Sequence, residues 1–251
     1  MKGRTYFDTL RRYFWPSKEE IKGLAIVVLV FAFIFSFREW GEETFDLFVG
    51  LANLFRAIII VAIAVFIHEA GQRLAAIKVG LKTEVRVWWY GLMAALILAF
   101  ISRGKLMFFA ATGMWIHHLA VHRLGSFRYG PNVQGFGVIA LMGPVANILA
   151  ATFVKFLQVN LHIIPMTSVF VQKFFFFSWL YAVLNLLPIP PLDGSRLLFY
   201  SRLTYAFVFG AIAGYLVLYS LGIYSYILAL IIGGVVWLLF YLLFESEWWQ
   251  G

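Results

Sequence analysis

Apolar stretches close to the length of a bilayer-crossing helix recur along the whole chain and leave little room for a soluble fold. A helix needs roughly 20 consecutive, mostly apolar residues to cross a bilayer. Of the 251 residues, 63% are hydrophobic and 13% are charged, whereas soluble domains are about 25% charged. The sequence therefore predicts an integral, multi-pass membrane protein with one helical transmembrane domain at residues 23–244.

The hydropathy pattern predicts six transmembrane helices and a hairpin. The expected spans are Gly23–Phe37, Leu54–Ala76, Gly135–Leu157, Ser168–Leu187, Leu203–Leu221 and Tyr224–Phe244. The hairpin is expected between the second and third of these spans, with arms at Val87–Ile101 and Leu106–Val121. Its second arm is too polar for a lipid-facing helix, so we expect a buried strand or a re-entrant segment there. The expected fold class is all-α polytopic, with a small β element allowed in the hairpin.

Basic residues set the expected orientation. Residues 1–22 form a basic leader, expected to lie as an amphipathic segment on the membrane surface, and residues 245–251 form a short tail. Lys and Arg also follow the second and fourth spans, whereas the loop after the first span is acidic. The positive-inside rule then places both termini in the cytoplasm, at the cell membrane. The net charge of +8 is spread over membrane-flanking loops and does not indicate nucleic-acid binding.

The segment His68-Glu69-Ala70-Gly71-Gln72 lies inside the second expected span. In the zinc-protease motif His-Glu-x-x-His, two histidines four residues apart lie on one helix face and bind the metal. The Glu between them moves the proton of the attacking water. Here the first histidine and the Glu are present, and Gln72 occupies the second ligand position. The chain has no cysteine, which excludes a thiolate metal site.

Glu69 and Asp193 are the two acids, of twelve in the chain, that lie in or against the apolar spans. An ionisable group in the membrane costs a few kcal/mol or more unless it is paired, hydrated or bound to a metal. Prolines 188, 190 and 191 hold the backbone before Asp193 extended, and Gly194 permits a turn directly after it. Both acids are expected near the cytoplasmic ends of their spans, at matching depth.

Three elements follow one another in an order that is specific to one family. They are the helix segment 66–72 with the His-Glu pair, the run Gly143-Pro144-Val145-Ala146-Asn147, and the Asn-x-x-Pro-x-Pro-x-Leu-Asp-Gly run at 185–194. On these residues, the chain resembles the site-2 protease family of intramembrane zinc metalloproteases over about residues 50–200. The resemblance implies one Zn²⁺ per chain and cleavage of transmembrane protein substrates near the cytoplasmic face. It implies His68 and Asp193 as zinc ligands and Glu69 as the general base. It also implies that Asn147 and Asn185 bind the substrate backbone or the oxyanion.

Gln72 departs from the family pattern and leaves three alternatives open. Its amide oxygen is a third, weaker ligand; or a histidine from His117, His118 and His122 replaces it; or the chain is an inactive relative that binds or escorts transmembrane segments. Each of those histidines, taken alone, is more typical of an interface or surface residue.

The other motif residues have structural alternatives as well. Glu69 and Asp193 could be paired with Arg73 and Arg196, and Gly143-Pro144 could be a packing element. A transporter or channel is disfavoured, because polar residues are too sparse in the spans for a conduction path.

Overall fold

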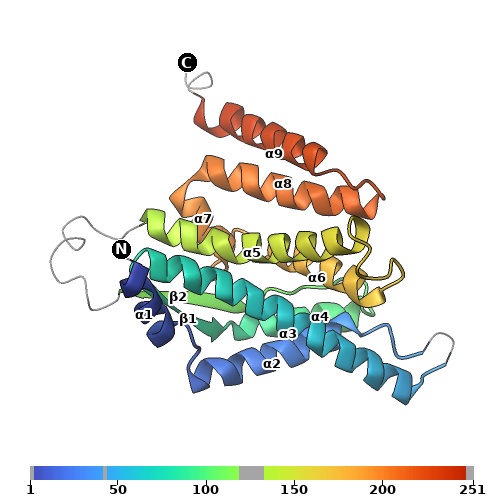
Figure 1. Ribbon diagram of the computed structural model, residues 1–251. Helices are drawn as coiled ribbons and strands as arrows, with labels where there is room; N and C mark the ends of the chain where they lie inside the picture. The colour runs from blue at the N-terminus through green and yellow to red at the C-terminus, as the bar shows by residue number, and fades with distance from the viewer. Residues whose placement is uncertain (1–2, 42–43, 119–132, 247–251) are drawn as a thin grey trace.

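The structure is a computed structural model that describes residues 3–41, 44–118 and 133–246 (Figure 1). Within these residues the chain is mostly helical and contains one two-stranded sheet. The elements are α1 Gly3–Tyr13, α2 Lys18–Phe35, α3 Leu47–Lys78, β1 Leu81–Val87, α4 Trp89–Ile101, β2 Thr112–His118, α5 Val133–Val159, α6 Val169–Asn185, α7 Asp193–Tyr200, α8 Arg202–Ser220 and α9 Tyr226–Phe240, which continues as a π-helical turn at Tyr241–Glu245.

Four helices in the described part of the chain are long and apolar enough to cross a membrane: α3, α5, α8, and α9 with the turn that follows it. The length and composition of these helices therefore indicate a membrane protein. Each of the six expected spans coincides with a helix, but the count of six is not confirmed. Helix α6 is short because it ends at Asn185, three residues before Pro188. Helix α2 begins with charged residues, among them Glu19 and Glu20.

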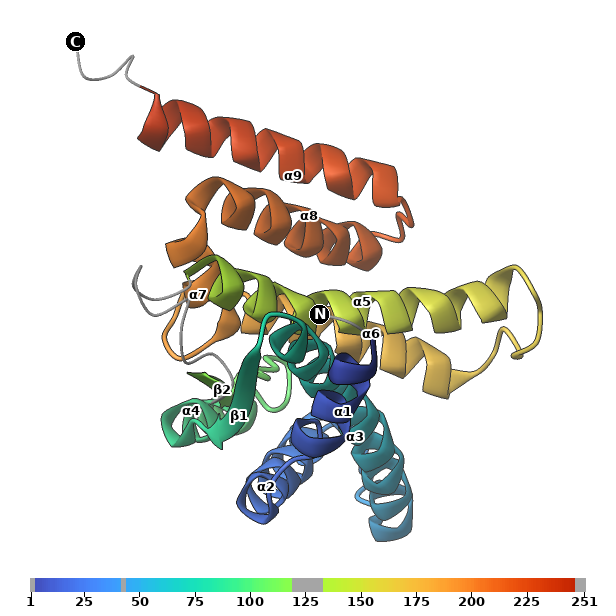
Figure 2. The same ribbon diagram turned by 60° about the vertical axis from the view of Figure 1, so that its left-hand side comes forward.

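Helix α5 runs through the middle of the molecule (Figures 1 and 2). It packs against α3 and α6, and the short α7 also contacts it. The α8–α9 pair forms an outer layer beside α5, whereas α2, α4 and the sheet lie on the other side (Figure 2). Helices α3, α5 and α6 pack against one another and carry His68, Asn147 and Asn185.

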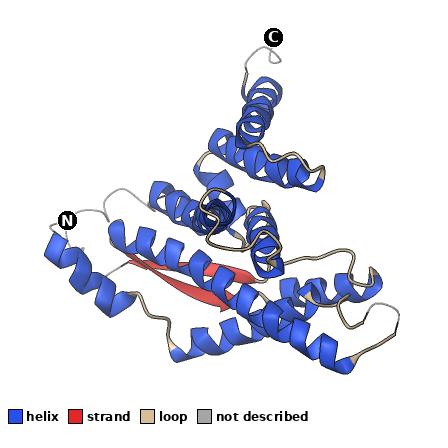
Figure 3. Ribbon diagram, turned by 45° about the vertical axis from the view of Figure 1, so that its right-hand side comes forward, coloured by secondary structure: helices blue, strands red, loops and turns tan. Residues whose placement is uncertain are grey.

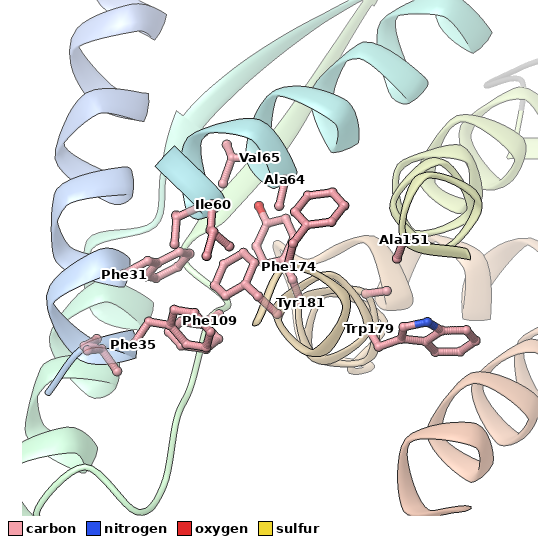
Figure 4. Close-up of a cluster of buried hydrophobic side chains, with 14 of the residues drawn as sticks. Phe31, Phe35, Ile60, Ala64, Val65, Phe109, Ala151, Phe174, Trp179 and Tyr181 are labelled. Atoms are coloured by element: carbon pink, nitrogen blue, oxygen red, sulfur yellow. The ribbon is translucent and has the colours of Figure 1, made fainter. Parts of the chain in front are cut away.

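An aromatic core joins α2, α3 and α6 (Figure 4). The rings of Phe31 from α2 and Phe109 lie 5.3 Å apart, and those of Phe109 and Phe177 from α6 lie 4.9 Å apart. Edge-on and tilted ring pairs of this kind contribute about 0.5–1.5 kcal/mol each beyond the area they bury. Since Phe109 precedes β2, this core also holds the start of the sheet against the helices.

Strands β1 and β2 pair antiparallel, with Leu81 opposite His118 and Val87 opposite Thr112 (Figure 3). The second arm of the expected hairpin does contain a strand, but its partner is β1, which directly follows α3, and not the first arm. That first arm is helix α4. Strand β1 alternates buried and more exposed residues, because its charged positions Lys82, Glu84 and Arg86 face outward and alternate with the buried Leu81, Thr83 and Val85.

A buried ion pair ties the leader to the helices. Arg73 of α3 donates to Glu20 of α2 at 2.6 Å, and both side chains are buried. Glu20 also accepts hydrogen bonds from the backbone N–H groups of Ser17 at 2.7 Å and Val85 of β1 at 2.9 Å. Burial by itself would raise the pKa of Glu20, but these hydrogen bonds and the Arg73 charge hold it below its ordinary value. The network fixes the junction of α1 and α2 against α3 and β1.

Candidate metal centre

His68 of α3 and Asp193 of α7, 125 residues apart in the sequence, meet in the interior. Nε2 of His68 lies 2.9 Å from Oδ2 of Asp193. The amide nitrogen of Gln72 donates to the same carboxylate oxygen at 2.8 Å and lies 3.2 Å from His68 Nε2. All three residues are buried, with at most 4% of their surface exposed. The structure therefore brings together His68, Gln72 and Asp193, the three residues that the sequence predicts as candidate metal ligands.

Local structure explains why these side chains converge. His68 and Gln72 are four residues apart on α3 and so occupy one face of the helix. Helix α6 ends at Asn185, and the chain returns through the proline-containing segment to start α7 at Asp193. A Cβ at Gly194 would lie 2.0 Å from the carbonyl oxygen of Leu186. Gly194 is therefore required for close packing against the end of α6, and not for the turn that the sequence suggested.

The Gly143–Asn147 run of α5 packs directly on His68. A Cβ at Gly143 would lie 2.5 Å from His68 Nε2, so a glycine leaves the space that the imidazole fills. The amide nitrogen of Asn147 lies 3.4 Å from His68 Nδ1, and Asn147 is fully buried. Gly143 thus lies against the Nε2 side of the ring, and Asn147 holds the Nδ1 side, away from Asp193, as partners of metal-ligating histidines do. Gly143-Pro144 is a packing element, and what it packs against is the candidate ligand.

We expect Gly143→Ala to destabilise the protein by roughly 1–3 kcal/mol and to displace His68, because the added methyl group overlaps a rigid ring. Gly234→Ala in α9 is the matched control, since a Cβ there has no atom within 4 Å. The control should be neutral or stabilising by up to about 1 kcal/mol. Thermal unfolding of both variants in one detergent checks this. Equal unfolding temperatures for the two would contradict the close contact between Gly143 and His68.

Glu69 is buried beside this cluster, and its Oε2 has no hydrogen-bond partner among the described residues. The cation one helical turn away, Arg73, is paired with Glu20 instead. Glu69 lines a cavity of about 320 Å³ between α2 and α3, whose other walls are mostly apolar and include Phe14 and Pro16 of the leader. An unpaired carboxylate at the edge of an apolar cavity is free to exchange a proton with a group brought into it.

Tyr181 is a neighbour of the site that the sequence did not single out. Its ring lies 5.0 Å from that of His68, in an edge-on arrangement. Spacing along α6 could have identified it, since Tyr181 lies four residues before Asn185 and so on the same face of the helix. Asn185 itself donates to the carbonyl oxygens of Tyr181 at 2.9 Å and Phe109 at 3.5 Å. Its amide nitrogen therefore holds the end of α6 and does not contact the His68 cluster.

The structure does not bring His117 to His68. His117 is exposed on the sheet, and its Nε2 lies 3.3 Å from Oε2 of Glu84. The hydrogen bond from Lys82 is the main reason why the pKa of Glu84 is below its ordinary value, and the His117 charge adds to it. The backbone of His118 lies in β2, but its side chain and the whole of His122 lie outside the described residues.

Arg196 does not pair with Asp193 either. Its guanidinium donates to the carbonyl oxygen of Met114 in β2. Burial lowers the pKa of Arg196 from its ordinary value, and the nearby Asp193 charge opposes that shift. Arg196 thus joins α7 to the sheet, and Asp193 keeps His68 and Gln72 as its hydrogen-bond partners.

The donor set fits a metal ion through two strong ligands and one weak one. Within residues 3–41, 44–118 and 133–246, no group of three His, Cys, Asp or Glu gathers. His68 and Asp193 supply an imidazole and a carboxylate, and the side-chain amide of Gln72 can present its oxygen after a half-turn. The buried Oδ1 of Asn147 has no hydrogen-bond partner among the described residues. After a half-turn of the amide, this oxygen would take the place of the nitrogen that lies 3.4 Å from His68 Nδ1 and would accept a hydrogen bond from Nδ1–H, which leaves Nε2 free to bind a cation.

Comparison with known proteins gives one informative match. A curated protein of Methanocaldococcus jannaschii named "Putative zinc metalloprotease MJ0611" is 30% identical to this chain over 201 residues, which are 80% of this chain and 94% of that protein. No protein-family model matches the chain. No solved structure matches it either.

Proposed function

Because this chain belongs to the metalloprotease family of its archaeal relative, we propose that it is an intramembrane zinc metallopeptidase of the site-2 protease type. Its substrates are transmembrane helices, which it cleaves near the cytoplasmic face of the cell membrane. The observation that carries the proposal is the 2.9 Å contact between His68 and Asp193, with the unpaired Glu69 beside them. This contact lies among helices long enough to cross a membrane.

Each polar residue of the site has a role in this proposal. His68 and Asp193 hold one Zn²⁺ per chain, with the Gln72 amide as the weakest donor. Bound zinc would supply a Lewis acid at the scissile carbonyl. Glu69 takes a proton from the attacking water and returns it to the leaving amine, so that the peptide bond breaks with no net change of charge. Asn147 orients the His68 ring. Asn185 holds the end of α6, and its role in binding the substrate backbone or the oxyanion stays a prediction.

The cavity beside Glu69 suits an apolar substrate. Its walls from α2 and α3 include Val28, Val65 and Phe66, and its volume is about 320 Å³. A transmembrane helix that unwinds near this cavity would place an apolar side chain in it while its backbone passes Glu69. The buried partners of the site restrict water, which strengthens electrostatic interactions there.

A non-catalytic function is favoured by one specific contact. The Gln72 amide donates to Asp193 at 2.8 Å, and His68 bonds the same oxygen. The three side chains therefore satisfy one another's hydrogen bonds without a metal. A site with two histidines and an acid would lack the amide donor that does this here. In this alternative the chain binds or escorts transmembrane segments in the cavity beside Glu69 and does not hydrolyse them.

The zinc content of the purified protein decides between the two functions. We expect about one zinc per chain in detergent-purified wild type, measured by elemental analysis, and a loss of that zinc in Asp193→Ala. Asp8→Ala, which changes an exposed acid of α1, is the control and should keep the metal. Wild-type protein that remains zinc-free after incubation with excess metal would contradict the peptidase proposal and support the non-catalytic function.

A further inference from the structure

A second pocket is lined by four helices, away from the His68 cluster. Its volume is about 580 Å³, and its lining comes from the last turns of α5 and α8, the first turn of α9 and the middle of α6. Lys155 of α5 lies in it, eight residues beyond Asn147, which is about 12 Å along the helix axis. We propose that this pocket binds the anionic phosphate headgroup of a membrane phospholipid.

The charge of the pocket favours an anion. Lys155 is the cation among the nine residues that line it, and none of those nine is acidic. Lys155 takes part in none of the ion pairs formed within the described residues. Its ammonium group donates to the side-chain oxygen of Gln158 at 2.9 Å. That neutral partner leaves the positive charge of Lys155 uncompensated among the described residues.

The position of Lys155 is fixed by its surroundings. Gln158 is fully buried, and its amide nitrogen donates to the carbonyl oxygen of Pro165 at 2.9 Å. The amide can therefore turn its oxygen to Lys155 and cannot swing away. A lysine held by a buried amide loses less side-chain entropy when it binds a ligand than a free surface lysine does.

Stacked aromatic rings form the opposite wall. Tyr215 of α8 and Tyr226 of α9 are parallel, with ring centroids 4.7 Å apart and an interplanar angle of 2°. Trp179 of α6 also stacks with Tyr215, with ring centroids 4.1 Å apart. Tyr226 also donates a hydrogen bond to Thr152 of α5 at 3.4 Å. This wall is rigid before any ligand arrives, and tyrosines at helix ends are typical of the level of lipid headgroups.

An apolar surface leads from the pocket along α5 and accounts for the rest of a lipid. Leu149, Phe153 and Phe156 are 63%, 61% and 47% exposed. They are spaced four and three residues apart, so they form one stripe on the helix. Phe156 belongs to the pocket itself. A phospholipid with an acyl chain on this stripe would have its phosphate at Lys155. A soluble phosphate compound has no acyl chain and would gain nothing from the stripe.

Native mass spectrometry of the full chain tests the proposal. Wild-type protein, offered equal amounts of phosphatidylglycerol and phosphatidylcholine with the same chains, should retain phosphatidylglycerol preferentially. Lys155→Gln should reduce that preference roughly fivefold, the contribution of one basic residue near a lipid surface. Lys155→Arg should keep it, and so should Lys105→Gln, which removes an exposed lysine outside the pocket.

Three results would overturn the inference. One is equal retention of the two lipids by wild type, a comparison that needs no variant. Another is an unchanged preference in Lys155→Gln. The third is competition by glycerol 3-phosphate at the concentration of the lipid, which would make the pocket a site for free anions. None of these readouts depends on peptidase activity, so the outcome is separate from that of the proposed function.

Discussion

Glu69→Gln is expected to abolish cleavage and to leave both the fold and the metal content unchanged. A missing general base typically costs about 10²–10⁴-fold in rate. Glutamine has the same shape as glutamate, and Oε2 of Glu69 has no hydrogen-bond partner that the change would break among the described residues. Since the change also removes a buried charge, the free energy of unfolding should not fall.

The measurement uses single-span reporter proteins reconstituted with the chain in proteoliposomes, with products identified by mass spectrometry. Glu19→Gln is the matched control, because Glu19 lies at the exposed start of α2 and contacts Lys22. It should cleave at the wild-type rate. Cleavage by Glu69→Gln at that rate would exclude Glu69 as the base. Loss of zinc or of the folded state in Glu69→Gln would show that Glu69 has a structural role.

Gln72→His is expected to raise the zinc affinity by at least about 10–100-fold. Changes in outer-shell partners alone shift metal affinity by that much, and this substitution supplies an inner ligand. Gln72 Nε2 already lies 3.2 Å from His68 Nε2 and 2.8 Å from Asp193. An imidazole at position 72 would therefore reach the same point, and would complete the set of three strong ligands that catalytic zinc sites have.

Zinc titration of the purified proteins, with a competing chelator, measures the effect. Gln172→His adds a histidine at an exposed position of α6, outside the cluster, and should leave the affinity unchanged. If cleavage is limited by metal occupancy, Gln72→His should also cleave faster at low zinc. An affinity equal to that of wild type would mean that position 72 does not face the metal, and would contradict the proposed ligand set.

The candidate ligands were accessible from the sequence because their signals are local. Spacing on one helix turn places His68 and Gln72 on the same face, and the proline-containing run before Asp193 predicts an extended segment. Hydropathy likewise located a helix at every expected span. By length and composition, α6 and α2 are not among the four described helices that can cross a membrane, because α6 is shorter and α2 is more charged.

Contacts between segments that are distant in the sequence could not be predicted from such local signals. The sequence does not mark β1 as a strand, because its alternating charges indicate a strand only once β2 pairs with it. Nothing in the sequence distinguishes Glu20 from the other charged residues of the leader, although it neutralises Arg73 and so leaves Glu69 unpaired. The distance from His117 to the cluster depends on how the sheet lies against α3, and the sequence does not contain that distance.

The amino-acid sequence alone predicts a helical membrane protein with His68, Glu69 and Asp193 as its candidate chemical groups, because length, apolarity and residue spacing act within one segment. Three facts come from the packed helices instead: His68 meets Asp193, Gly143 leaves the space for that ring, and Lys155 lies without an acid in a pocket lined by aromatic residues. These facts depend on how helices pack, which is set by the shapes of many side chains together.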